Sequence, residues 1–132
     1  SFDRGRSLLL AGMLKWRVEG DIKGASGSWQ RVLEMGDEHL TPLAACLLGK
    51  TDPAVLSASY NLERWDEAGI YLPYTLGMWA LINGDTSTSA RHLEQVVALR
   101  KADTLKERER ALLESWAVAD LAKLRSGEKK TP

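Results

Sequence analysis

Several features that would point to a particular class of protein are scarce in this sequence of 132 residues. It has one cysteine, Cys46, so no disulfide can form within the chain, and the apolar neighbours of Cys46 suit a small buried side chain. Eighteen basic residues balance eighteen acidic ones, so no net charge attracts the chain to nucleic acid or to an anionic membrane. The longest uncharged stretch, about residues 68–83, is shorter than the ~20 apolar residues that a membrane-spanning helix needs. We therefore expect a soluble protein without membrane insertion or nucleic acid binding, and the lack of disulfides favours the cytoplasm over export.

Strand patterns are also missing, because β-branched residues are scattered singly and apolar–polar alternation never lasts. Apolar residues instead recur at spacings of three and four, which is the period of a helix packed on one side. The clearest case is the pair of segments 71–83 and 86–100, which meet at Gly84 and Asp85. Glycine there supplies a left-handed residue that ends the first helix, and Asp85 or Thr86 can cap the second. The expected fold class is therefore all-α.

Helical spacing extends over the rest of the chain, with glycine at several predicted helix ends. Asp21 can cap one helix, and Asp52 followed by proline is a start signal for another. The third helix can begin at either residue 37 or residue 41. The predicted helices are 7–19, 22–35, 37–48, 54–62, 71–83, 86–100 and 103–125, followed by a polar tail.

A repeated pattern follows the glycines that end three of these helices. The glycines are Gly20, Gly49 and Gly84; the residues five positions later are Ala25, Ala54 and Ser89; and those nine positions later are Trp29, Ala58 and Leu93. The pair Leu76 and Gly77 stands in the helix before the last of these glycines. This pattern resembles the tetratricopeptide repeat, a helix-turn-helix unit of about 34 residues. The middle unit departs from it, with Thr41 and Pro42 where the leucine–glycine pair would stand.

The resemblance implies a right-handed superhelical stack of antiparallel helix hairpins, in a single domain over residues 1–126. The implied parts are hairpins over 6–36, 37–65 and 70–101, a final helix over 103–126 and a disordered tail over 127–132. The alternative is an irregular helical bundle in which glycine–aspartate pairs merely cap helices. Because the chain begins at Ser1 without an initiator methionine, we expect it to be a piece of a longer protein of this kind.

No residue constellation typical of catalysis stands out in the sequence. The segment 44–51 is one substitution from a phosphate-binding loop, but a predicted helix precedes it where such a loop needs a strand. His39 and His92 each lack a second ligand at metal-binding spacing. Paired carboxylates at predicted helix starts are explained by the helix dipole. We therefore expect no enzymatic activity, no metal and no cofactor.

In tetratricopeptide stacks the first helices of successive units line a concave surface, and the resemblance implies that a peptide or partner helix binds there. The implied partner-binding residues are Leu10, Leu14, Arg17, His39, Tyr71, Tyr74, Met78 and Arg108. Aromatic, methionine and arginine side chains are common at binding hot spots, although the same positions could instead face a neighbouring repeat. The expected function is a non-catalytic scaffold or protein-interaction module. Two alternatives stay open, namely a helical accessory or regulatory domain of a larger enzyme and a module that forms homodimers.

Overall fold

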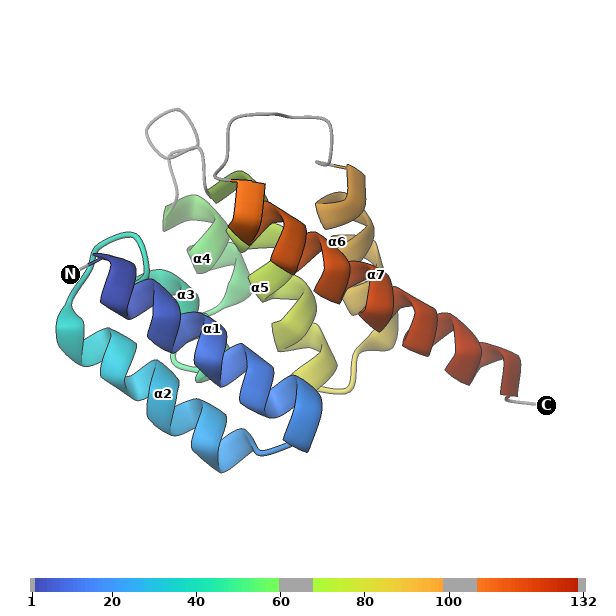
Figure 1. Cartoon of the computed structure of the whole chain (residues 1–132), viewed down its shortest axis with the longest axis horizontal. Coiled ribbons are helices and arrows are strands. Elements are labelled where there is room, and N and C mark those ends of the chain that lie inside the picture. Colours follow the sequence, from blue (N-terminus) through green and yellow to red (C-terminus); the bar gives the residue numbers. More distant parts are fainter. Residues whose placement is uncertain (1, 60–67, 99–106, 131–132) are drawn as a thin grey trace. The chain divides into compact units, whose positions relative to one another are not determined.

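The computed structural model describes residues 2–59, 68–98 and 107–130 of the chain. Within these ranges it contains seven α-helices and no strand (Figure 1). The all-α prediction is therefore confirmed. The helices are α1 (Phe2–Glu19), α2 (Ile22–Met35), α3 (Thr41–Leu47), α4 (Pro53–Ser59), α5 (Ala68–Ile82), α6 (Thr86–Ala98) and α7 (Glu107–Lys130).

The chain divides into two compact units, residues 1–60 and residues 61–132. The first unit contains α1 to α4, and the second contains α5 to α7. The sequence led us to expect one continuous domain built from stacked hairpins. The superhelical stack that the resemblance implies stays a prediction.

The observed helix bounds agree with the predicted ones most closely at the turns. α2 begins and ends at the predicted residues, and α5 and α6 meet at the predicted turn around Gly84. α3 starts at Thr41, the later of the two starts that the sequence allowed. Asp37 closes a turn before it, because the carbonyl oxygen of Asp37 accepts hydrogen bonds from the N–H groups of Leu40 and Thr41.

The largest differences from the predicted bounds lie at the two ends of the chain. α1 begins at Phe2, earlier than the predicted residue 7. α7 begins at Glu107 and continues to Lys130. Residues 127–130, which were expected to belong to a disordered tail, are therefore helical. Those parts of the predicted helices that fall in 60–67 and 99–106 lie outside the described residues.

Glycine–aspartate turns connect the helices of the two main hairpins. Gly20 and Gly84 have φ angles of 64° and 77°, in the left-handed region that glycine adopts without a steric penalty. The carboxylate that follows each glycine accepts a hydrogen bond from the backbone N–H three residues later, at 2.8 Å for Asp21 and 3.1 Å for Asp85. Asp52 caps α4 with a 2.8 Å hydrogen bond from the N–H two residues later. All three predicted caps are therefore confirmed.

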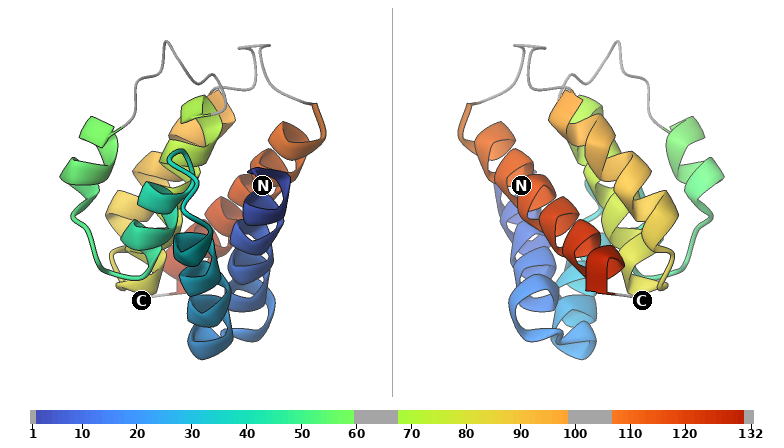
Figure 2. Two further views of the ribbon diagram at one scale, coloured as in Figure 1. Left: turned by 90° about the vertical axis from the view of Figure 1, so that its left-hand side faces the viewer. Right: turned by 90° about the vertical axis from the view of Figure 1, so that its right-hand side faces the viewer.

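In the first unit α1 and α2 form an antiparallel hairpin, visible in Figure 1 and Figure 2. A Cβ atom on Gly12 would overlap the indole ring of Trp29. The indole N–H of Trp29 donates a hydrogen bond to the carbonyl oxygen of Leu9 at 3.2 Å, and Trp29 is completely buried. This contact sets the close approach of the two helices. The other buried apolar residues of the unit are Leu9, Met13, Ala25, Val32, Leu40, Leu43, Ala44, Cys46, Leu47 and Leu56.

In the second unit α5 and α6 form another antiparallel hairpin (Figure 2). Gly77 lies at the contact between these two helices. A Cβ atom on Gly77 would lie 2.9 Å from Cδ2 of Leu93. The buried hydroxyl of Ser89 donates a hydrogen bond to the carbonyl oxygen of Gly77 at 2.8 Å. α7 packs against both α6 and α5, so the second unit is a bundle of three helices.

Equivalent positions of the predicted repeat are buried to the same extent in these two hairpins. Ala25 and Ser89, five residues after the turn glycines, are buried, and so are Trp29 and Leu93, nine residues after them. The two alanines at the corresponding positions of α4 are exposed. The unit that departs from the pattern in the sequence therefore also departs from it in the structure.

Candidate partner-binding surface

The predicted binding residues of α1 lie on its outer face. Leu14 is 46% exposed, and Leu10 and Arg17 are half-buried. Val18, one turn beyond Leu14, is 72% exposed. Because a helix repeats every 3.6 residues, Leu10, Leu14 and Val18 form a line along α1 on the side away from Gly12. We call this line of three side chains the α1 ridge.

Sequence reasoning identified Leu10 and Leu14 but missed Val18 as an exposed residue. Val18 follows Leu14 by four residues, a spacing that suits the buried side of a helix as well as an exposed line. The structure distinguishes the two readings, because few large apolar residues of the described chain are exposed. They are Leu14, Val18, Ile22, Val55, Leu112 and Val118.

Basic side chains flank the α1 ridge. Among the described side chains of α1, Arg4, Arg6, Lys15 and Arg17 are basic and Glu19 alone is acidic. Helical periodicity places Arg17 on one side of the ridge and Lys15 on the other. α1 therefore combines an apolar line with basic borders, although the chain as a whole carries no net charge.

The predicted binding residues of α5 are core residues rather than an open surface. Tyr71, Tyr74 and Met78 are all buried. The hydroxyl of Tyr74 donates a hydrogen bond to Oδ2 of Asp120 in α7 at 3.2 Å, and the ring centroid of Trp116 in α7 lies 5.9 Å from that of Tyr74. These α5 side chains, which the resemblance assigns to a partner-binding surface, are thus buried in the structure, and Tyr74 is held against α7 of the same unit.

The spacing of the α5 residues could not show whether they form a partner-binding face or part of the core. Tyr71, Tyr74 and Met78 recur at intervals of three and four, which suits an inward face of a stack and a core face equally well. Asp120, which pairs with Tyr74, is likewise not among the residues predicted from the sequence. The available signal was a carboxylate within the apolar side of α7, because a buried carboxylate requires a hydrogen-bond donor.

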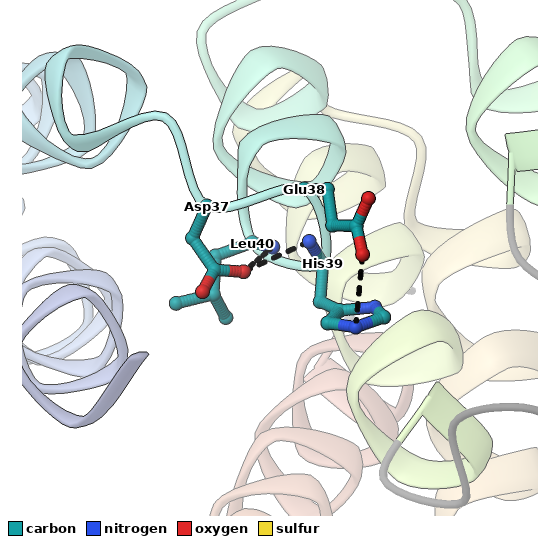
Figure 3. A network of polar contacts seen from close by, with 4 residues as sticks. All are labelled: Asp37, Glu38, His39 and Leu40. Carbon is teal, nitrogen blue, oxygen red and sulfur yellow. Dashed lines mark hydrogen bonds and ion pairs between the residues drawn. The ribbon is translucent and has the colours of Figure 1, made fainter. Parts of the chain in front are cut away.

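His39 belongs to the turn before α3 and not to the α1 ridge (Figure 3). The N–H groups of His39 and Leu40 both donate hydrogen bonds to Oδ1 of Asp37, at 2.8 and 3.3 Å. Nε2 of His39 lies 3.7 Å from a carboxylate oxygen of Glu38, and 41% of the His39 side chain is exposed. The structure thus assigns His39 a local role at a turn. Arg108 lies in α7, but its side chain falls outside the described residues.

A small cleft lies on the first unit, between the start of α1 and the end of α2. Its volume is about 260 Å³, and it is lined by Arg4, Leu8, Arg31, Glu34 and Met35. This volume is below the ~300–1,000 Å³ of most small-molecule sites. Its lining combines two arginines, one carboxylate and two apolar side chains, without a histidine or a nucleophile. Glu34 is therefore the one side chain of this lining that could take part in general acid–base catalysis.

Three other kinds of site were considered in the sequence, namely a metal site, a reactive cysteine and a phosphate-binding loop. The described residues contain no cluster of three histidine, cysteine, aspartate or glutamate side chains that could hold a metal ion. Burial, with a smaller contribution from the charge of Asp52, raises the pKa of the Cys46 thiol to about 11, so the thiol is protonated near neutral pH. Residues 44–47 of the segment that resembles a phosphate-binding loop belong to the helix α3, and Asp52 caps α4 directly after the segment. This context differs from the strand, loop and helix that phosphate binding needs.

None of the helices in the described ranges is long and apolar enough to cross a membrane. Comparison with models of protein families, with curated proteins and with solved structures finds no significant match to this chain. The resemblance to the tetratricopeptide repeat therefore depends on the residues of the two hairpins alone.

Proposed function

We propose that this chain is a non-catalytic protein-interaction module, with a tetratricopeptide-like helical fold, that binds another polypeptide through the α1 ridge. The observation that carries the proposal is the exposure of Leu14 and Val18 on consecutive turns of one helix. Leu10 extends the apolar line by one further turn. Burial of apolar surface contributes about 25 cal/mol per Å², and grouped exposed apolar side chains mark interaction sites.

The α1 ridge stands on a helix whose opposite face is firmly packed. The indole of Trp29 lies directly on Gly12, and a Cβ atom on Gly5 would lie 2.9 Å from Cδ1 of Leu40. These contacts fix the inner face of α1 within the first unit. A surface that is ordered before binding loses little conformational entropy when a partner docks, which favours affinity.

Selection of random peptides displayed on phage against the immobilised protein tests this proposal. We expect enriched peptides that bind the wild-type chain and lose at least about tenfold in affinity for Val18→Lys, because the ammonium group disrupts the apolar contact. Val55→Lys is the matched control, since Val55 is 55% exposed on α4 and the same substitution is made away from α1. Circular dichroism verifies that both variants keep their helices.

Two outcomes of this selection would contradict the proposal. One is a set of peptides that bind wild type, Val18→Lys and Val55→Lys with equal affinity. The other is a selection that enriches no peptide at all. Loss of binding in Val18→Lys alone would support the α1 ridge as the docking surface.

A further inference from the structure

We infer that the α1 ridge takes an amphipathic α-helix with acidic borders, an inference that rests on the proposed function. Two features of the ridge define this partner. The first is a line of apolar side chains at helical spacing, Leu10, Leu14 and Val18. The second is the pair of basic side chains beside that line, Arg17 on one side and Lys15 on the other.

A helix is the occupant that covers the α1 ridge without leaving backbone groups unpaired. The backbone of α1 is engaged in its own helical hydrogen bonds, so it offers no strand edge to an extended peptide. An extended peptide laid across these side chains would lose water from its N–H and C=O groups and gain no partner for them. A helix satisfies its own backbone and makes contact through side chains alone.

The spacing of the ridge also sets the pattern of the partner. Leu10, Leu14 and Val18 extend over about 12 Å, given a rise of 1.5 Å per residue. A row of side chains spaced by four residues packs against rows spaced by three or four residues on a second helix. We therefore expect apolar partner residues at positions i, i+3 or i+4, and i+7.

Charge selects an acidic partner over a second copy of this chain. Two copies docked through their α1 ridges would bring four basic borders together, with Glu19 as the only described acidic side chain on each α1. Glutamate or aspartate on both sides of the apolar row of a different helix would instead meet Lys15 and Arg17. Such complementarity raises association rates and disfavours basic partners.

Two synthetic peptides of about three heptads test the inference directly. Both carry leucines at i, i+3 or i+4, and i+7, and their borders carry glutamate in one peptide and lysine in the other. Fluorescence anisotropy in about 0.05 M NaCl should show the glutamate peptide binding roughly tenfold more tightly, and this advantage should shrink at about 0.5 M NaCl. Circular dichroism should show the glutamate peptide becoming more helical on binding.

Variants of the protein separate this inference from the proposed function. Lys15→Glu together with Arg17→Glu should reverse the preference between the peptides, and Lys15→Glu alone should shift it less in the same direction. Val18→Lys should remove binding of the glutamate peptide, whereas the matched Val55→Lys should not.

Equal affinity for the two peptides, or a bound peptide without helical signal, would overturn the inference. Absence of binding by both peptides would overturn it as well, while display-selected peptides that still lose affinity in Val18→Lys would preserve the proposed function. A concentration-dependent dimer in sedimentation that Val18→Lys abolishes would also overturn it, since a second copy would then occupy the ridge.

Discussion

The α1–α2 and α5–α6 hairpins share one internal arrangement. In each, a glycine of the first helix receives a large side chain from the second helix, Trp29 on Gly12 in one case and Leu93 on Gly77 in the other. Both large residues stand nine positions after a turn glycine in the left-handed conformation. The same sequence pattern therefore produces the same helix–helix contact twice.

The two hairpins differ in what contacts the first helix from outside. In the second unit α7, a helix of 24 residues, packs on both α5 and α6 and engages Tyr74 through Asp120 and Trp116. In the first unit the third helix, α3, has 7 residues and packs on α2, and Leu14 and Val18 of α1 stay exposed. Equivalent apolar spacing thus becomes core in one unit and an interaction surface in the other.

Removal of the large side chains should produce the largest losses of stability, and each substitution should destabilise only its own unit. Trp29→Ala should destabilise the first unit by about 4 kcal/mol, and Leu93→Ala the second by about 3 kcal/mol. Cys46 is the only cysteine of the chain and is buried in the first unit, so thiol labelling reports on that unit. At pH 8, in moderate urea, labelling should accelerate in Trp29→Ala and stay unchanged in Leu93→Ala.

Because of the raised pKa of Cys46, thiol labelling reports selectively on unfolding of the first unit. Burial raises the thiol pKa from 9.0 to about 11, so the folded protein holds little reactive thiolate at pH 8. Because the folded pKa lies above the unfolded one, the associated stability is complete below pH 9 and is lost as the pH rises towards 11. Equal acceleration of labelling in both variants would contradict separate cores.

Glycine-to-alanine changes should have intermediate effects on stability and should compare the two helix contacts more closely. Gly12→Ala should cost about 2 kcal/mol, because the new methyl group overlaps an indole held between two helices. Gly77→Ala should cost about 1 kcal/mol, since it meets the end of the more flexible Leu93 side chain. Gly27→Ala is the matched control, with nothing within 4 Å of its added Cβ, and should stabilise the protein by up to about 1 kcal/mol.

Urea unfolding measures all three changes under the same conditions. If Gly12→Ala and Gly27→Ala shifted the unfolding midpoint in the same direction, the contact between Gly12 and Trp29 would be refuted. A larger loss in Gly77→Ala than in Gly12→Ala would reverse the assigned order of the two contacts.

Local features of the fold followed from the sequence because they depend on neighbouring residues. Gly84 with Asp85, and Asp52 with the proline after it, carry their turn and cap geometry within a few positions. Burial of Trp29 and Leu93 followed from their fixed distance after a turn glycine.

The part of the site that could not be predicted depends on contacts distant in the sequence. Tyr74 and Asp120 lie 46 positions apart, and nothing in the spacing of α5 indicates that α7 contacts it. Leu14 and Tyr74 present equivalent patterns to sequence reasoning, and only the packing of a third helix distinguishes them.

Tyr74→Phe should have the smallest of these effects on stability and none on binding. Loss of the hydroxyl removes its hydrogen bond to Asp120 and should cost about 1 kcal/mol in urea unfolding. Affinity for the glutamate peptide should be unchanged, because Tyr74 belongs to the core of the second unit. A weaker peptide affinity at unaltered stability would instead restore α5 as a binding surface.

Titration of the ¹⁵N-labelled protein with the glutamate peptide, followed by amide NMR shifts, tests the central claim most directly. We predict that the largest shifts fall on amides around Leu10, Leu14 and Val18, while those of residues 71–78 stay in place. Shifts concentrated in 71–78 with α1 unaffected would contradict the account.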